Sequence, residues 1–132
     1  MASIPEEYEG LFGRKTFAHV ATLMDDGTPQ VTPVWVDYDG EYVLINTVRG
    51  RQKERNLTRD PKVGLSILDP EDPYTYLSIR GEVAEVTEDG AVEHIDSLAR
   101  RYMDVEEYPY HDAEDEPRVI VKIRPERVVT GQ

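Results

Sequence analysis

Six basic residues gather between Arg49 and Lys62, in a chain whose net charge is -12. The same window holds only two acidic residues, Glu54 and Asp60, although the whole chain has 27 acidic and 15 basic residues. A local reversal of charge in an acidic protein favours an anionic ligand, held against a repulsive background. The alternative is a solvated basic helix whose side chains pair with carboxylates on the surface.

The spacing of these basic residues suits a phosphate group. Residues 53–59 are predicted to form a short helix that ends before the next proline. On that helix Arg51 and Arg55 would share one face, and Arg49 and Lys53 would share another. Arginine offers a planar fork of donors and lysine a compact point charge, and both bind phosphate oxygens.

Two short polar side chains precede the basic segment. Asn46 and Thr47 stand at the end of a predicted strand and could each hydrogen-bond to a bound anion. The helix N-terminus near Arg51 would add backbone N–H groups and a favourable dipole. The whole stretch therefore predicts a cradle for a phosphorylated ligand.

Pro33 lies in the middle of a predicted strand, residues 30–39, where it cannot donate a ladder hydrogen bond. The simplest interpretation is an edge strand or a bulge. The functional alternative is that a ligand lies against the open backbone, where a flat heteroaromatic ring could accept hydrogen bonds from amide groups. Trp35, the only tryptophan, is expected in the core more often than against a cofactor.

Other chemistries lack their motifs. No Gly-x-Ser-x-Gly elbow or P-loop occurs, and the absence of cysteine excludes disulfides, thiol nucleophiles and thiolate metal sites. The three histidines are far apart and lack ligand spacing, so no metal site is predicted. His19 is expected to be packed and hydrogen-bonded, and His94 to be solvated on the polar flank of a helix. The acidic stretch 104–117 lacks the ligand spacing and turn glycine of a calcium loop, and is interpreted as a solvated loop.

These side chains need a framework of short strands. Hairpin turns at Asp26-Gly27 and Asp39-Gly40 indicate an antiparallel meander. A glycine inside a long strand, Gly81, marks a bulge or bend. Strands are predicted at 16–24, 30–39, 41–48, 62–69, 74–88 and 118–130, the last broken near Pro125, and further helices at 4–14 and 90–103. The pattern predicts a mainly β fold: a closed or partly closed antiparallel barrel with helices at its mouth.

Length and charge set the protein class. We expect one domain over residues 1–132. No apolar run is long enough for a membrane span and no secretion signal is visible, so a cytoplasmic location is expected. The acidity argues against binding nucleic acid or anionic membranes. Eleven arginines against four lysines, with abundant Asp and Glu, is the composition expected of a protein that stays soluble in high salt.

Several motifs together resemble one known family. They are TP-x-W at residues 32–35, NT-x-x-G-R-x-K-x-R-N-L-x-R-D-P at 46–61, PY-x-Y-L-x-I-R-G-x-V at 73–83, and the closing RVIVKIRPERV. This order is similar to the split β-barrel flavin and deazaflavin proteins, which include pyridoxamine phosphate oxidases and reductases that use coenzyme F420. The helix EHIDSLARRYM matches the reductase branch, and the resemblance covers Phe17 to Val128.

The resemblance implies a pyridoxamine phosphate oxidase-like, FMN-binding split barrel with a defined cofactor site. It places the cofactor phosphate at Asn46, Thr47, Arg51 and Lys53, with Asn56 nearby. It places the tricyclic ring against Thr32, Pro33 and Val34. It also implies a homodimer with the site at the subunit interface, so Tyr74 and Tyr76 would approach from the other subunit.

The implied function is hydride transfer between coenzyme F420 and an unsaturated small-molecule substrate. The anionic oligoglutamate tail of F420 would use Arg49 or Arg55, and flavin mononucleotide (FMN) has no such tail. Two alternatives stay open: an FMN-dependent oxidase or reductase of the same fold, and a non-catalytic protein that binds a cofactor or a haem-like molecule.

Overall fold

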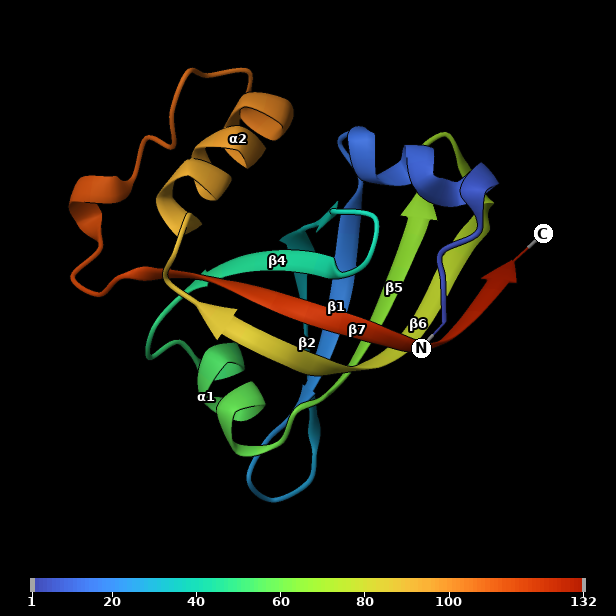
Figure 1. Ribbon diagram of the computed structural model, residues 1–132, viewed down its shortest axis with the longest axis horizontal. Helices are drawn as coiled ribbons and strands as arrows, with labels where there is room; N and C mark the ends of the chain where they lie inside the picture. The colour runs from blue at the N-terminus through green and yellow to red at the C-terminus, as the bar shows by residue number, and fades with distance from the viewer. Residues whose placement is uncertain (1, 132) are drawn as a thin grey trace.

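One curled antiparallel sheet of seven strands forms the body of the protein (Figure 1). The structure is a computed structural model that describes residues 2–131. The strands are β1 (Phe17–Leu23), β2 (Pro29–Trp35), β3 (Asp37–Tyr38), β4 (Val43–Val48), β5 (Lys62–Asp69), β6 (Asp72–Thr87) and β7 (Arg118–Gly131). The predicted mainly β, barrel-like fold with helices is confirmed.

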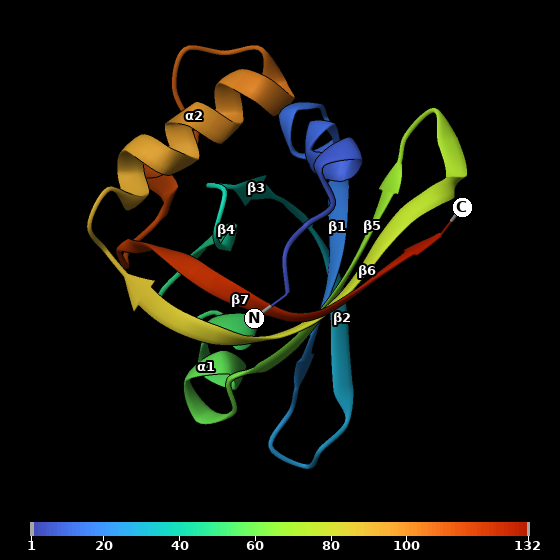
Figure 2. The same ribbon diagram turned by 45° about the vertical axis from the view of Figure 1, so that its right-hand side comes forward.

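The sheet curls because its two edge strands are consecutive in the chain. The strand order is β2-β1-β5-β6-β7-β4-β3, so β2 and β3 stand at opposite edges. Only Val36 separates these two strands in sequence. The chain therefore joins the edges, and the sheet wraps round its core as a partly closed barrel (Figure 2).

The break at Val36 corrects the predicted single strand 30–39. The backbone N–H of Val36 lies 3.2 Å from the Tyr102 hydroxyl, and its carbonyl accepts from Arg101 Nη1 at 3.1 Å. Side chains of a distant helix thus take the hydrogen bonds that a continuing ladder would have used. A buried residue whose backbone is already paired can turn the chain from one edge of the sheet to the other.

Alternating side chains on the strands fill the barrel. In β1 and β5 every second residue is buried, including Val20 and Ile67. Gly81 interrupts β6 at a register shift, and a Cβ there would stand 2.3 Å from the Arg124 carbonyl oxygen. The predicted irregularity at Gly81 is confirmed, and close backbone approach is its cause. The predicted break at Pro125 is only a shift in register, since β7 runs on to Gly131.

Helices cover the open ends of the sheet. The helices are the 3-10 helices η1 (Glu6–Gly13) and η2 (His111–Ala113) and the α-helices α1 (Gln52–Arg59) and α2 (Ala91–Met103). Leu11 and Phe12 of η1 are buried, as their apolar character predicted. In Figure 1, α1 and α2 lie on opposite sides of the same, left-hand end of β4 and β7. None of the helices between residues 2 and 131 has the length and apolar character needed to cross a membrane.

Candidate cofactor site

A cavity of about 360 Å³ lies where β2, β4, α1, α2 and the start of β7 meet. Its wall combines cationic, amide and aromatic side chains, which is the usual make-up of a small-molecule site. The lining residues are Phe17, Pro33, Val34, Trp35, Asn46, Thr47, Arg51, Lys53, Ile95, Leu98, Met103, Tyr108, Tyr110 and Arg118. The cavity thus brings together six of the ten residues assigned to the cofactor from sequence.

Lys53 is the least compensated charge in this wall. Burial, and then the neighbouring charge of Arg51, lower the pKa of its ammonium group. Within residues 2–131, Lys53 forms no salt bridge, whereas Arg51 lies 3.4 Å from a Glu114 carboxylate oxygen. A half-buried cation without a counter-ion is costly in the free protein, so an anion bound beside it would be strongly favoured.

Thr47 supplies a second unsatisfied group. Its hydroxyl oxygen is buried and has no hydrogen-bond partner among the described residues. Buried polar atoms are nearly always paired, so an orphan in a cavity wall indicates a missing ligand. Together, the Thr47 hydroxyl and the Lys53 ammonium fit an anionic group such as a phosphate.

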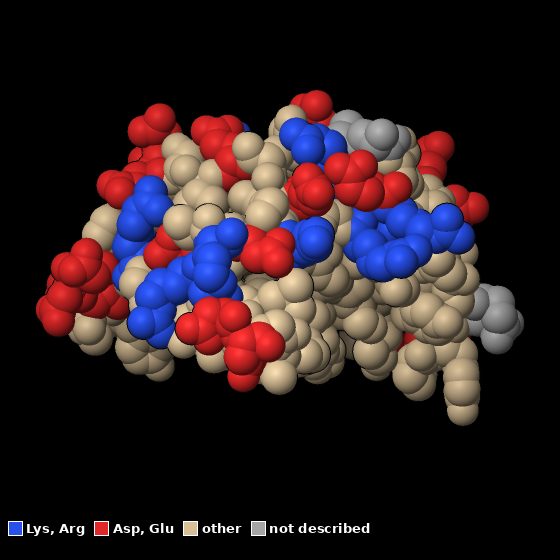
Figure 3. Space-filling model, turned by 90° about the horizontal axis from the view of Figure 1, so that it is seen from below, with Lys and Arg blue, Asp and Glu red and all other residues tan. Residues whose placement is uncertain are grey.

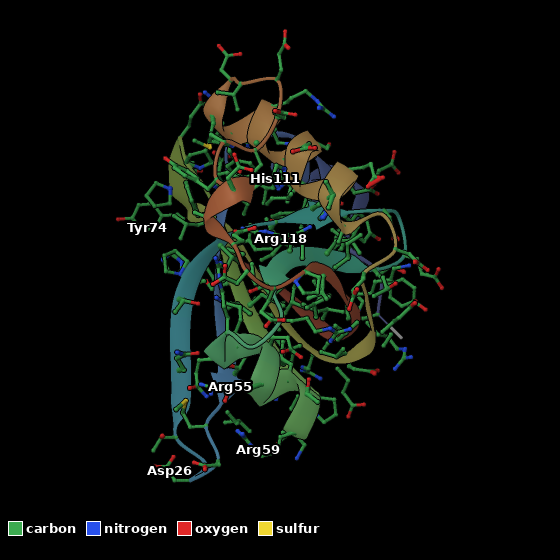
Figure 4. All side chains as sticks on the ribbon, turned by 90° about the vertical axis from the view of Figure 1, so that its left-hand side faces the viewer. Asp26, Arg55, Arg59, Tyr74, His111 and Arg118 are labelled. Atoms are coloured by element: carbon green, nitrogen blue, oxygen red, sulfur yellow. The ribbon has the colours of Figure 1, made fainter. Side chains whose placement is uncertain are left out.

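Arg118 closes this end of the cavity, and its position between α1 and η2 is visible in Figure 4. The guanidinium is almost fully buried and donates to both oxygens of Glu114, to Asn46 Oδ1 at 3.2 Å and to the Tyr108 hydroxyl at 2.8 Å. Burial opposes ionisation of Glu114, but the bonds from Arg118 outweigh it and hold the pKa of that carboxyl below its usual range. The pair is a rigid, charged part of the wall.

His94 is wrongly predicted as solvated. It packs beneath Asn46, with Nδ1 at 3.1 Å from Asn46 Nδ2 and Nε2 at 3.1 Å from Asp37 Oδ2. Arg101 holds the other oxygen of Asp37 at 3.1 Å. Helical spacing places His94 beside the apolar stripe of α2. The residues that pack against this side of the helix are polar, Asn46 on β4 and Asp37 at the start of β3, so His94 is buried against polar partners.

Pro33, Val34 and Trp35 form the opposite wall. They belong to β2, which stands at one edge of the sheet and, of the described strands, pairs with β1 alone, so the predicted edge strand is confirmed. Trp35 is half-buried rather than in the core, where it was expected. It stacks on Tyr102 with ring centroids 5.1 Å apart and contacts Tyr108 edge-on. This wall therefore offers an open strand edge beside flat aromatic surface, which suits a planar ring.

Four residues assigned from sequence lie outside the cavity lining. Thr32 is next to it on β2. Asn56 is fully buried and gives its amide to the Thr22 hydroxyl at 3.0 Å, so it anchors α1 to β1 instead of facing a ligand. Tyr74 and Tyr76 lie on β6, and Tyr74 is 74% exposed, so their predicted role from the other subunit stays a prediction.

Several lining residues escaped the sequence analysis. Tyr108, Tyr110 and Arg118 belong to or follow the stretch 104–117, which is therefore not simply a solvated loop. The only sequence signal for Arg118 is its position directly after a segment with seven acidic residues.

His19, expected to be packed, is exposed on the outer face of β1. Within residues 2–131 no group of three His, Asp or Glu side chains is arranged to hold a metal ion.

Glu54 holds the turn that carries Arg51 into position. Its carboxylate accepts the Gly50 N–H at 2.8 Å and the Thr58 hydroxyl at 2.7 Å, and lies 3.5 Å from Arg49 Nη1. Gly50 has a φ of +90°, which favours glycine at this turn. Burial opposes ionisation of Glu54, but these donors outweigh it and lower the pKa from its ordinary value of 4.5.

We expect Glu54→Gln to lower the free energy of unfolding by about 1–2 kcal/mol at neutral pH, because charge-assisted bonds to the turn are lost. A carboxylate with a lowered folded-state pKa stabilises above its unfolded pKa, and that contribution disappears as pH falls through the folded value. The difference between variant and wild type should therefore shrink in acid. Urea unfolding at pH 7 and pH 3 checks this, and a difference that persists unchanged at pH 3 would contradict it.

Most basic side chains near α1 lie outside the cavity. On the face seen from below, where α1 lies in Figure 1, Lys and Arg gather in groups between acidic side chains (Figure 3). Arg49 pairs with Glu54 and Glu88, whereas the Arg55 side chain hydrogen-bonds, among the described residues, only to the neutral Gln52. Of the two arginines suggested for a longer anionic tail, Arg55 is thus the less occupied.

Comparison with known proteins agrees with this architecture. The model of the pyridoxamine 5'-phosphate oxidase family matches residues 4–130. A solved structure named F420 reductase is 38% identical, with a TM-score of 0.82, and the match covers 96% of this chain and 98% of that one. A conserved hypothetical protein from Mycobacterium tuberculosis is 27% identical, with a TM-score of 0.72, over 98% of this chain and 86% of that one.

A more distant structure shows the fold alone. HupZ from Group A Streptococcus is 21% identical, with a TM-score of 0.69, over 96% of this chain and 93% of that one. A comparison with curated proteins gave no match. Because the family model spans nearly the whole chain and the curled sheet is that of its structural relatives, the chain belongs to the pyridoxamine 5'-phosphate oxidase family.

Proposed function

We propose that this protein is a coenzyme F420-dependent oxidoreductase, which transfers a hydride between the deazaflavin and an unsaturated small molecule. The observation that carries the proposal is the cavity itself, whose lining combines the uncompensated Lys53, Thr47 with its unpaired hydroxyl, and the open strand edge at Pro33 and Val34. The 38% identity to a structure named F420 reductase, over 98% of that chain, supports F420 over FMN.

The chain's own residues would bind and orient the cofactor. Lys53, Arg51 and Thr47 would hold its phosphate, and the edge formed by Pro33 and Val34 would lie against its ring. The bound deazaflavin supplies a ring carbon that gives or accepts a hydride, and the protein supplies position and electrostatics. Trp35, Met103 and Tyr110 in the lining would exclude water from the reacting ring.

A proton donor is also available from the lining. The Tyr108 hydroxyl accepts a hydrogen bond from Arg118, so its own hydrogen remains free to be donated. Tyr108 lines the cavity, whereas Tyr74 and Tyr76 of the same chain do not. We therefore assign product protonation to the Tyr108 hydroxyl, with solvent or Tyr74 and Tyr76 of a second subunit as the alternatives.

A homodimer is part of the proposal. Large apolar side chains remain exposed on β1, β2, β6 and β7, among them Phe17, Val31, Tyr74 and Val129. Phe17 also lines the cavity, so covering this surface with a second copy would close the site. Light scattering on the purified protein checks this, and a monomer at micromolar concentration would remove Tyr74 and Tyr76 from the site.

Turnover is the test of the enzymatic claim. Reduced F420 should be oxidised by the protein in the presence of unsaturated acceptors such as enones or quinones, and the loss of reduced cofactor can be followed by absorbance. Tight F420 binding without oxidation of the cofactor by any acceptor would favour the non-catalytic binding protein instead.

Thr47→Val should weaken F420 binding without lowering the stability of the fold. Because the Thr47 hydroxyl has no partner within residues 2–131, its loss should not lower the free energy of unfolding. F420 affinity should fall by about 1 kcal/mol, roughly fivefold, as for one lost hydrogen bond. Isothermal calorimetry and thermal unfolding measure the two effects.

Thr16→Val is the matched control for that variant. The Thr16 hydroxyl is also buried without a partner among the described residues, but Thr16 does not line the cavity. F420 should bind the Thr16 variant as it binds wild type. Equal losses of affinity in the two variants would show that the effect comes from the fold and not from a ligand contact.

A further inference from the structure

The orientation of the Asn46 side-chain amide follows from two neighbours whose polarity is unambiguous. The Ala91 carbonyl, which can only accept, lies 2.9 Å from Asn46 Nδ2. The Arg118 guanidinium, which can only donate, lies 3.2 Å from Asn46 Oδ1. Turning the amide over would place oxygen against oxygen and N–H against N–H, so this arrangement is the only one that satisfies both neighbours.

The orientation of the Asn46 amide determines the tautomer of His94. Asn46 Nδ2 is a donor with two hydrogens, and the one not given to Ala91 points to His94 Nδ1 at 3.1 Å. Nδ1 must therefore accept, so the ring proton lies on Nε2. Nε2–H then donates to Asp37 Oδ2 at 3.1 Å, an acceptor whose other oxygen is bound by Arg101.

The hydrogen bonds of Asn46 and Arg118 leave few donors free for a ligand in the cavity. Both amide hydrogens of Asn46 are used inside the protein, so Asn46 has none left for an anion. Arg118 uses four of its five N–H groups on Glu114, Tyr108 and Asn46, and one N–H of Nη1 remains for a ligand. Asn46 Oδ1 accepts from that same nitrogen and so sets its direction.

We propose that His94 is a positioning residue of the cavity, which accepts a hydrogen bond from Asn46 and so presents the Asn46 oxygen to Arg118. Asn46 then orients the free Nη1 donor of Arg118 toward a bound anion instead of contacting the anion itself. The charged groups around His94 are Asp37 on β3, Arg101 on α2 and, through Asn46, Arg118 on β7.

Two substitutions test the roles of the two ring nitrogens of His94 separately. His94→Asn keeps an oxygen acceptor near the position of Nδ1 but cannot reach Asp37. His94→Gln keeps a donor near the position of Nε2 but removes the acceptor for Asn46. The binding measurement rests on the proposed function, and its probe is F420, with occupancy read from the emission of Trp35, the only tryptophan and a lining residue.

The expected result is F420 affinity within about twofold of wild type for His94→Asn, and at least about fivefold weaker for His94→Gln, as for one lost hydrogen bond. If His94 served only to anchor Asp37, the order would be reversed. Equal losses in both variants, or no loss in either, would also overturn the proposal, because the Nδ1 acceptor would then be irrelevant.

The tautomer of His94 can be measured by NMR spectroscopy without the cofactor. Long-range ¹H–¹⁵N correlation on the wild-type protein should show neutral His94 with its proton on Nε2, and slowly exchanging Asn46 side-chain hydrogens. A proton on Nδ1 would overturn the proposal even if F420 binds. If wild type fails to bind F420, the proposed function fails, and this tautomer measurement still tests the role of His94.

Discussion

Arg118→Leu is expected to lower the free energy of unfolding by about 3–5 kcal/mol, the cost of removing one partner from a buried ion pair. The variant would leave the Glu114 carboxylate, the Asn46 oxygen and the Tyr108 hydroxyl without the donor that now satisfies all three. The Glu114 side chain is only 9% exposed, so water cannot fully replace the lost guanidinium. Urea denaturation at neutral pH measures the change.

Arg124→Leu is the matched control on the same strand. Arg124 lies 3.8 Å from Glu126, and both side chains are more than a third exposed. Exposed pairs of this kind contribute about 0–1 kcal/mol, so the control should unfold nearly as wild type does. A similar small effect for Arg118→Leu would show that Arg118 is not the structural centre of the cavity wall.

Lys53→Met is expected to weaken F420 binding by about 1.5–3 kcal/mol, roughly 10- to 150-fold, because a charge-assisted contact to the cofactor phosphate is lost. Its stability should move the other way. Burial lowers the Lys53 pKa, so the folded state holds the ammonium less readily than the unfolded chain does. Removing that cation should leave the free energy of unfolding unchanged or raise it.

Lys62→Met tests whether the loss of affinity comes from the Lys53 contact or only from the summed charge of the basic segment. Lys62 ends the same basic segment, is exposed, and does not line the cavity. Its loss should change F420 affinity by less than about threefold at physiological salt, since exposed charges at a distance are screened. An equal loss of affinity in both lysine variants would mean that the segment attracts anions only through its summed charge.

Local patterns predicted the parts of the site that depend on neighbours in sequence. The reversal of charge at residues 49–62 located α1 and two cavity residues at its start, Arg51 and Lys53. The rule that proline lacks a ladder donor placed Pro33 on an edge strand. The hairpin turns predicted the β1–β2 and β3–β4 pairs, but the predicted three-stranded meander is wrong, because the break at Val36 sends β2 and β3 to opposite edges of the sheet. Each of these features follows from chemistry within a few residues.

Long-range pairings carried the rest, and no pattern revealed them. The Asn46 and His94 side chains meet across 48 positions, and Arg118 reaches Asn46 across 72. From sequence alone Asn46 was assigned as a phosphate ligand and His94 as a solvated residue, since neither partner could be placed. The kink at Val36 likewise depends on Tyr102 and Arg101, which lie in a helix far along the chain.

Asn56 illustrates a different error, in which proximity in sequence suggested a ligand contact that the structure does not have. It lies within the basic segment, so proximity in sequence assigned it to the cofactor. The helix turns its side chain toward β1, where the amide bonds to Thr22 and Gln52 consume its polar atoms. A helix only two turns long has both a ligand face and a core face, and the basic residues around Asn56 concealed which face it occupies.

The most direct test of the account is a paired equilibrium titration of the purified, cofactor-free protein with F420 and with FMN, at low and at multimolar salt. Cofactor fluorescence would report binding from the ligand, and Trp35 emission would report it from the cavity wall. We expect saturable binding that is tighter for F420 than for FMN and is weakened by Lys53→Met. Preferential FMN binding would contradict the deazaflavin assignment, and binding of neither cofactor would contradict the assignment of the cavity as a cofactor site.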